Sequence, residues 1–183
     1  MTVITSLIRR IDRPIAFVGL MGSGKSMLGR RLANALNLPF ADTDSLVEEA
    51  AGITIAEIFE IAGEAKFRTL EHRIIDEIAT DGPAVISTGG GTICNAQSAA
   101  LLLEHCVVVW LSATPKNLLA RIGATHSRPL LAGGDPLGVL TQLSAEREPH
   151  YKQAHIHLVT DGLSTTAAFD ALLDILDSNL PIK

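Results

Sequence analysis

The segment "FVGLMGSGKSMLGRRL", residues 17–32, constrains the fold of this chain more than any other part of the sequence. It opens with an apolar run, crowds three glycines into a turn and continues with helix-favouring residues. The spacing Gly19-x-x-x-x-Gly24-Lys25-Ser26 is that of a phosphate-binding loop between a strand and a helix. In such a loop the backbone amides and the positive helix end face the β- and γ-phosphates. The segment therefore predicts a nucleoside triphosphate site, in which Lys25 adds positive charge and Ser26 can bind Mg²⁺.

Short apolar runs alternate with helical patterns along the whole chain, which is typical of a parallel sheet covered by helices on both faces. Helix starts are indicated by a capping box at Thr54 and Glu57, by Pro115 after Thr114, and by Ser164. We therefore expect an α/β fold of three layers, α/β/α, with a five-stranded parallel sheet. The expected strands lie near residues 15–20, 38–42, 84–88, 107–111 and 156–160.

The length of 183 residues fits one domain, which we expect over residues 14–178, with flexible tails at 1–13 and 179–183. A net charge of -5 argues against a nucleic-acid binder, and no apolar block reaches the ~20 residues of a membrane span. The first residues lack the basic and apolar regions of a signal peptide, which favours a cytoplasmic protein. Cys94 and Cys106 stand far apart and are interpreted as structural thiols.

Two acids and three glycines follow other expected strands, at the edge of the sheet where ligands of such folds bind. Asp42 and Asp44 come at the end of the second strand, and neither later apolar strand ends in the acid that usually helps to hold Mg²⁺. We therefore assign Asp42 to the outer shell of the metal and Asp44 to the hydroxyls of a substrate; helix capping is the alternative. Gly89, Gly90 and Gly91 follow the third strand and can offer amides to a carboxylate or phosphate.

Three arginines stand where each could bind an anion. Arg68 lies in the helical stretch "GEAKFRTLEHR" and Arg147 in "SAEREPHY", and from composition alone an ordinary arginine on a solvated helix face is the favoured interpretation of both. Arg128 lies in the loop-like segment "GATHSRPLLAGGDP", which could close over the nucleotide as a lid near residues 123–135. Closure would exclude water and direct positive charge at the transferred phosphoryl group.

Three aromatic residues are assigned structural roles. His155 and His157 alternate onto one face of the last expected strand, but no third ligand is near in sequence, so half-exposed histidines are favoured over metal ligands. Trp110, within "VVVWL", is expected in the core or against a helix.

Taken together, the motifs of this chain resemble those of the shikimate kinases over residues 14–178. They occur in the same order and at compatible intervals: "GLMGSGKS", "DTD", "IAEIFEIAGEAKFR", "STGGG", "RPLL" and "EREPHY". The phosphate-binding loop alone is shared by many unrelated proteins, whereas its combination with the other five motifs is specific. The resemblance implies the P-loop kinase type of α/β fold, a monomer, and Mg²⁺ as cofactor with ATP as co-substrate.

The resemblance also implies a role for each matching residue. Asp44 would bind the ring hydroxyls of shikimate and act as base or orienting group, and Lys25 and Arg128 would complete the catalytic set. Ser26 would bind Mg²⁺, with Asp42 in its outer shell. The nucleotide site would comprise Gly22, Ser23, Gly24, Lys25, Ser26, Met27, Arg121 and Arg128. The shikimate site, whose two arginines grip the carboxylate, would comprise Asp44, Arg68, Gly89, Gly90, Gly91 and Arg147.

The implied reaction is transfer of the γ-phosphoryl group of ATP to the 3-hydroxyl of shikimate, giving shikimate 3-phosphate and ADP. Two other enzymes stay open at this point: a kinase for another small hydroxylated acid such as gluconate, and a nucleoside monophosphate kinase, which normally has several lid arginines. A nucleotide-binding regulatory module without catalysis is the alternative from another class. Met27 departs from the family pattern, which commonly has a second hydroxyl residue there, and this departure would weaken nucleotide binding modestly.

Overall fold

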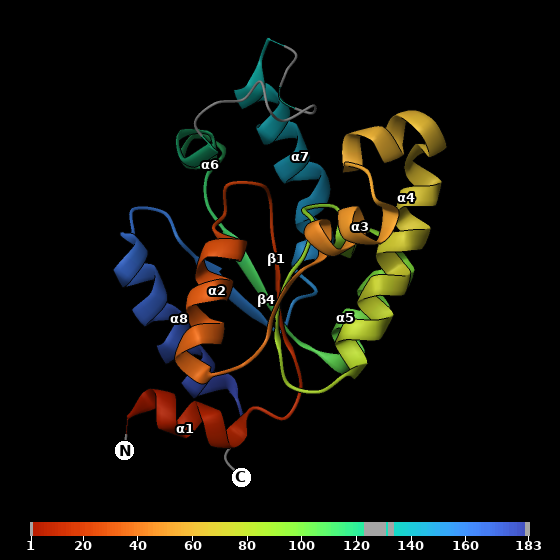
Figure 1. Ribbon diagram of the computed structural model, residues 1–183. Helices are drawn as coiled ribbons and strands as arrows, with labels where there is room; N and C mark the ends of the chain where they lie inside the picture. Colours follow the sequence, from red (N-terminus) through yellow and green to blue (C-terminus); the bar gives the residue numbers. More distant parts are fainter. Residues whose placement is uncertain (1, 123–130, 132–133, 182–183) are drawn as a thin grey trace.

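The computed structural model describes residues 2–122, 131 and 134–181, and these contain a five-stranded sheet (Figure 1). Its strands run parallel in the order β2-β3-β1-β4-β5. The predicted α/β class and the five predicted strands are confirmed. The strands are β1 (Ile15–Val18), β2 (Phe40–Asp42), β3 (Val85–Ser87), β4 (Val107–Ser112) and β5 (Ile156–Val159).

Helices connect the strands and cover both faces of the sheet (Figure 1). Three predicted helix starts are confirmed: Thr54 forms a capping box with Glu57, Pro115 is the first residue of its helix, and Ser164 caps the last one. The long helix α4 is interrupted at Gly63, whose φ of 76° is left-handed. The described helices are α1 (Val3–Arg10), α2 (Lys25–Leu36), α3 (Thr43–Ala51), α4 (Ile55–Thr80), the 3₁₀ turn η1 (Thr92–Cys94), α5 (Ala96–His105), α6 (Pro115–Ile122), α7 (Pro136–Tyr151) and α8 (Thr165–Asn179). Within the described ranges, none of them has the length and apolar character needed to cross a membrane.

Two apolar cores lie on opposite faces of the sheet. The first holds Phe17 of β1 together with residues of α1, α2 and α8, and the second holds Ala16 and Val18 together with residues of α4, α5, α6 and α7. Strand β1 is buried along its whole length, because helices cover it on both sides. The central strand and the loop that follows it are therefore held from both faces of the sheet.

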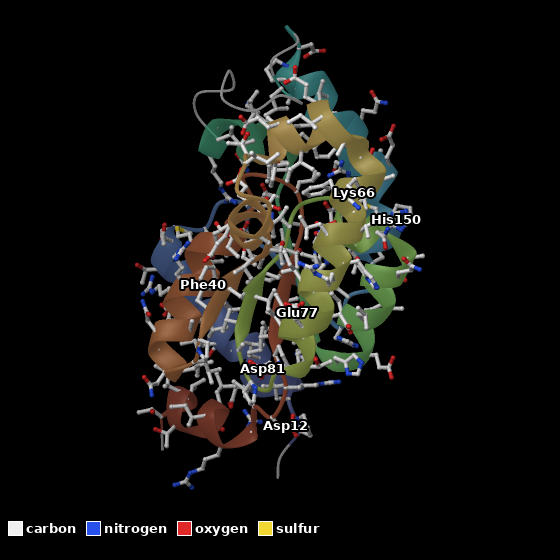
Figure 2. All side chains as sticks on the ribbon, turned by 45° about the vertical axis from the view of Figure 1, so that its right-hand side comes forward. Asp12, Phe40, Lys66, Glu77, Asp81 and His150 are labelled. Carbon is white, nitrogen blue, oxygen red and sulfur yellow. The ribbon has the colours of Figure 1, made fainter. Side chains whose placement is uncertain are left out.

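The loops predicted to carry chemistry leave the carboxyl ends of the strands. The phosphate-binding loop follows β1, Asp42 ends β2, and the glycines 89–91 follow β3. Because the strands are parallel, these loops share one edge of the sheet, where ligands of such folds bind. Figure 2 shows Asp12 and Asp81, which precede β1 and β3, at the other end of the molecule.

The prediction of a flexible tail over residues 1–13 is wrong, because residues 3–10 form helix α1, which packs against α8. Leu7 is fully buried in the first core. The buried Arg10 guanidinium donates to the Asp177 carboxylate and to the carbonyl oxygens of Asp177 and Leu180. Leu180, which belongs to the second predicted tail, is buried as well. These partners lie at the far end of the sequence, so the pairing of the two ends is a tertiary contact.

Candidate active site

Two glycines of the phosphate-binding loop have backbone conformations that other residues rarely adopt. Gly19 has a φ of 140°, and Gly24, the N-cap of α2, has a φ of 97°. A Cβ on Gly19 would lie 2.3 Å from the Leu111 carbonyl oxygen, so a side chain there would push the loop away from β4. Lys25 begins α2, and its Nζ donates to the carbonyl oxygens of Gly19 and Leu20 at 2.9 and 3.0 Å. The ammonium group is thus held over a loop whose amides can bind phosphate.

The Ser26 hydroxyl lies between oxygen atoms from two neighbouring strands. It donates to Asp42 Oδ2 at 2.7 Å and lies 2.9 Å from Ser87 Oγ. Asp42 is the N-cap residue of α3, but its side chain makes no capping hydrogen bond, so the capping alternative does not describe its carboxylate. Mg²⁺ prefers oxygen ligands and combines one or two from the protein with phosphates and water. The oxygen set around Ser26 therefore fits the predicted metal.

Asp44 is the second residue of α3 and faces the glycine turn after β3, because a Cβ on Gly89 would lie 2.7 Å from Asp44 Oδ1. Burial of the carboxyl, followed by the negative charges of Asp42 and Glu71, raises the pKa of Asp44 from 3.8 to about 6. The positive charge of Lys25 opposes this rise in the pKa. A carboxylate of this kind is ionised at neutral pH and more basic than an ordinary aspartate.

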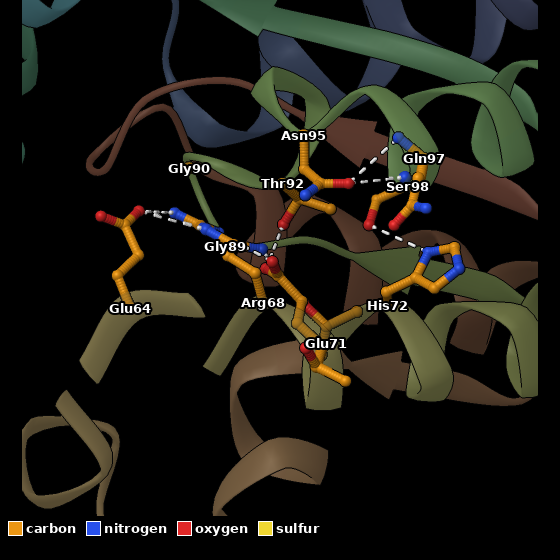
Figure 3. A network of polar contacts seen from close by, with 12 residues as sticks. Glu64, Arg68, Glu71, His72, Gly89, Gly90, Thr92, Asn95, Gln97 and Ser98 are labelled. Atoms are coloured by element: carbon orange, nitrogen blue, oxygen red, sulfur yellow. Dashed lines mark hydrogen bonds and ion pairs between the residues drawn. The ribbon is translucent and has the colours of Figure 1, made fainter. Parts of the chain in front are cut away.

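Glu71 was not predicted from the sequence, yet it lies at the centre of a polar network (Figure 3). Its side chain is fully buried; Oε2 accepts from Arg68 Nη1 at 2.7 Å, and Oε1 accepts from Thr92 Oγ1 at 2.6 Å. Arg68 also donates from Nε and Nη2 to the exposed Glu64, at 3.3 and 3.2 Å. A Cβ on Gly91 would lie 2.6 Å from Arg68 Nη2. The buried carboxylate therefore fixes the Arg68 guanidinium against the glycine turn.

The glycine turn, residues 89–91, lies between Arg68 and Arg147. On the Arg147 side, a Cβ on Gly90 would lie 3.4 Å from Nη1 of this arginine. Tyr151 follows one helical turn after Arg147 on α7, and its hydroxyl donates to the Gly90 carbonyl oxygen at 2.6 Å. Two guanidinium groups from α4 and α7 thus flank one glycine turn, an arrangement suited to binding a carboxylate.

Arg121 stands on the nucleotide side of the pocket. Its Nη1 donates to Thr160 Oγ1 at 2.8 Å and its Nη2 to the Thr160 carbonyl oxygen at 2.6 Å, which connects the end of α6 to the residue after β5. Met27 also lines the pocket and is 47% exposed. Arg128 and most of the predicted lid, residues 123–135, lie outside the described residues.

A cavity of about 650 Å³ unites the phosphate-binding loop, the acids, the arginines and the glycine turn. All the predicted site residues that the structure describes line it, namely Gly22, Ser23, Gly24, Lys25, Ser26, Met27, Asp42, Asp44, Arg68, Gly89, Gly90, Gly91, Arg121 and Arg147. The lining residues that were not predicted include three with polar side chains in the network around the site: Glu71, Ser87 and Thr160. For Glu71 the available signal was its spacing of three residues from Arg68 within one helix.

A family model and the sequence relatives agree on one family. A family model described as Shikimate kinase matches residues 21–177. A shikimate kinase of Brucella canis is 40% identical over 178 residues, which cover 96% of this chain and 89% of the relative. A shikimate kinase of Caulobacter vibrioides is 46% identical over 164 residues, which cover 90% and 82%. The solved structure of the shikimate kinase from Acinetobacter baumannii in complex with shikimate matches with a TM-score of 0.82 and 35% identity, covering 91% of this chain and 92% of that one.

Proposed function

This chain belongs to the shikimate kinase family, and we propose how the residues of its cavity share the reaction of such a kinase. It is an ATP-dependent kinase that transfers the γ-phosphoryl group to the 3-hydroxyl of shikimate, releasing shikimate 3-phosphate and ADP. One observation carries the proposed roles: Asp44, Arg68 and Arg147 line the same cavity as Lys25 and Ser26. The family match favours this reaction over a gluconate kinase, a nucleoside monophosphate kinase or a regulatory module.

The phosphate-binding loop and Lys25 bind the triphosphate in this proposal. Phosphoryl transfer depends mainly on alignment of the reacting atoms and on neutralisation of charge. The amides of residues 22–26 and the amino end of α2 supply oriented partial charges, and the Lys25 ammonium adds a full positive charge beside them. Arg121 and Met27 lie where they can contact the rest of the nucleotide.

Ser26 is the proposed protein ligand of Mg²⁺, with Asp42 accepting hydrogen bonds behind it. The 2.7 Å bond between Ser26 Oγ and Asp42 Oδ2 supports this role, because it places a carboxylate beside the hydroxyl that faces the phosphates. When bound, the metal neutralises negative charge on the β- and γ-phosphate oxygens. Ser87 Oγ lies 2.9 Å from Ser26 Oγ and adds a further oxygen atom beside the proposed metal ligand.

The acceptor is held by Asp44, the two arginines and the glycine turn. Arg68 and Arg147 bind the carboxylate of shikimate from two sides, and the amides of residues 89–91 contribute further donors. Asp44 accepts a hydrogen bond from the attacking 3-hydroxyl and orients its oxygen toward the γ-phosphoryl group. Its raised pKa also lets the carboxylate take up the proton of this hydroxyl as the bond to phosphorus forms.

Three predictions extend beyond the described geometry. We keep Arg128 as a lid residue that directs positive charge at the transferred group, and we keep the monomer and the cytoplasmic location as predictions from the sequence. The acceptor assay below measures none of these three properties.

The acceptor is tested by incubating the purified protein with Mg²⁺ and ATP and adding shikimate, gluconate or a nucleoside monophosphate in parallel. ADP release above the background without acceptor is the readout. We expect release with shikimate alone. Turnover with another acceptor and none with shikimate would keep the phosphate-binding loop but overturn the proposed roles of Asp44, Arg68 and Arg147.

A further inference from the structure

The glycine turn needs a partner from outside to fix its shape. Three consecutive glycines have no side chains, and their backbones are more mobile than those of other residues. Gly90 in particular is placed between two functional parts, because a Cβ on it would lie 3.4 Å from Arg147 Nη1 and 3.5 Å from the Gly19 carbonyl oxygen. A small rotation of this peptide would therefore change the distance from the acceptor's carboxylate site to the phosphate-binding loop.

The Tyr151 hydroxyl supplies such a partner. It donates to the Gly90 carbonyl oxygen at 2.6 Å, a short hydrogen bond between residues far apart in sequence. Because a trans peptide is planar, the Gly90 carbonyl and the Gly91 N–H point in opposite directions, so fixing one fixes the other. Gly89 N–H donates to Thr43 Oγ1 and the Gly91 carbonyl accepts from Cys94 N–H, so the Tyr151 bond holds the middle peptide of the turn and with it the direction of the Gly91 N–H.

The ring of Tyr151 is itself held rigidly. The residue is only 2% exposed, and its ring stacks on that of Trp110 with centroids 5.7 Å apart. Trp110 stacks in turn on His157, with centroids 3.8 Å apart. Burial raises the pKa of the Tyr151 hydroxyl well above its ordinary value, while the charge of Arg147 opposes the rise. The hydroxyl consequently stays protonated and remains a donor over the working range of pH.

Tyr151 also connects the glycine turn to Arg147. The two residues are four positions apart on α7 and therefore lie on the same face of this helix. A rigid-body movement of α7 that displaces the Arg147 guanidinium would also move the Tyr151 hydroxyl and, through its hydrogen bond, the Gly90 carbonyl. The turn and the arginine thus keep a fixed separation, which a rigid carboxylate needs on both of its sides.

We propose that Tyr151 is a positioning residue for the acceptor: its hydroxyl fixes the Gly90–Gly91 peptide relative to Arg147 and thereby sets the affinity for shikimate. The inference rests on the proposed function, which places the carboxylate of shikimate between Arg147 and the glycine turn. Tyr151 acts through these groups and needs no contact with the substrate itself.

The test is Tyr151→Phe, which removes one oxygen and keeps the ring that stacks on Trp110. Loss of one hydrogen bond predicts a KM for shikimate that rises about three- to tenfold, with kcat and the KM for ATP changed by less than about twofold. A folded variant with an unchanged KM for shikimate, or with an equal rise in the KM for ATP, would overturn the inference. Trp110→Phe is the matched control, since it perturbs the stacking and keeps the hydroxyl; an equal rise in the KM for shikimate there would assign the effect to packing.

Arg147→Lys separates this inference from the proposed function. If Arg147→Lys raises the KM for shikimate and Tyr151→Phe does not, the acceptor site stands and only the role of Tyr151 falls. If neither variant changes this KM, the proposed acceptor site falls with it. In the double variant, the effects should not add, because both act on the same carboxylate grip.

A spectroscopic measurement covers the case in which Tyr151→Phe does not fold. Tyr151 is the only tyrosine of the chain, so incorporation of 3-fluorotyrosine gives a single ¹⁹F resonance beside the hydroxyl in question. Saturation with shikimate should shift this resonance, whereas ADP alone should shift it less. A resonance that does not move on saturation with shikimate would overturn the inference.

Discussion

Ser26 Oγ donates to Asp42 Oδ2 over 2.7 Å, and this bond joins the loop after β1 to the end of β2. It connects a hydroxyl proposed to bind Mg²⁺ with a carboxylate that stands behind it. The proposed metal and acceptor positions are therefore neighbours, because Asp44 follows Asp42 by only two residues. Substitution of Ser26 or Asp42 should therefore weaken the binding of Mg²⁺ more than it lowers the stability of the fold.

Asp42→Asn should raise the Mg²⁺ concentration needed for half-maximal activity about tenfold, because an amide is a weaker acceptor beside the metal's ligand. The measurement is initial rate against free Mg²⁺ at a fixed concentration of ATP. Asp81→Asn is the control, since Asp81 lies at the other end of the molecule (Figure 2). An unchanged Mg²⁺ dependence in Asp42→Asn would remove Asp42 from the metal site.

Asp44 predicts a pH dependence of catalysis. Burial raises the pKa of Asp44 to about 6, and its ionised form is proposed to accept the proton of the hydroxyl, so kcat/KM for shikimate should be constant above pH 7 and decline as pH falls through about 6. Asp44→Asn should lower kcat by about 100-fold or more and abolish this limb of the profile. Retention of full activity in Asp44→Asn would exclude its proposed role.

The same raised pKa predicts a gain in stability on neutralising Asp44. Its folded-state pKa of about 6 lies above the ordinary 3.8, so the favourable contribution of the protonated carboxyl is present at acid pH and is lost as pH rises through about 6. Asp44→Asn should therefore unfold at a higher temperature than the parent at about pH 8, and the difference should vanish near pH 4. Thermal unfolding of both proteins at the two pH values makes this comparison.

Glu71→Gln should raise the KM for shikimate about tenfold and lower stability, because it leaves the Arg68 guanidinium without its buried partner charge. Glu64→Gln is the matched control: it removes the other carboxylate on Arg68, but the Glu64 side chain is 65% exposed, so its effect should be less than about twofold. Equal effects of the two variants on the KM for shikimate would show that the buried Glu71 positions Arg68 no better than the exposed Glu64 does.

Arg10→Ala should destabilise the protein by about 2–3 kcal/mol, because it removes hydrogen bonds from a buried guanidinium to Asp177 and Leu180. This corresponds to a Tm lower by about 5–10 °C in a chain of this length. Arg9→Ala, which truncates the exposed neighbouring arginine, should leave the Tm within about 1 °C. The kinetic constants of both variants should match the parent, since α1 lies at the end of the molecule away from α3, α6 and α7, whose residues line the cavity (Figure 1).

The sequence predicted the strands and the phosphate-binding loop well, because local patterns determine both. Apolar runs of four or more residues are buried wherever helices cover a sheet, and the glycine spacing at Gly19 and Gly24 matches the φ values that the loop needs. The interruption of α4 at Gly63 was not predicted, since one glycine within a helical pattern is often tolerated.

What the sequence did not reveal depends on contacts between distant residues. Glu71 has the composition of an exposed helix around it, and only its packing against Thr92 makes it a buried carboxylate. Tyr151 donates to Gly90, 61 residues earlier in the chain, and Arg10 donates to Asp177, 167 residues later. For α1 a local signal did exist, because Val3, Ile4, Leu7 and Ile11 recur with helical spacing.

The strand order determines which segments of the sequence supply the residues of the proposed acceptor site. The strands β2 and β3 lie on one side of β1, and the segments that follow them hold Asp44, Glu71 and the glycine turn. Arg121 and Thr160 follow β4 and β5, which lie on the other side of β1. The proposed acceptor site therefore draws mostly on residues 43–95, to which α7 adds Arg147 and Tyr151. Exchange of residues 43–95 together with those two positions of α7 would therefore replace most of the proposed acceptor site, while the phosphate-binding loop and Asp42 are kept and only Ser87 of the metal position lies in the exchanged segment.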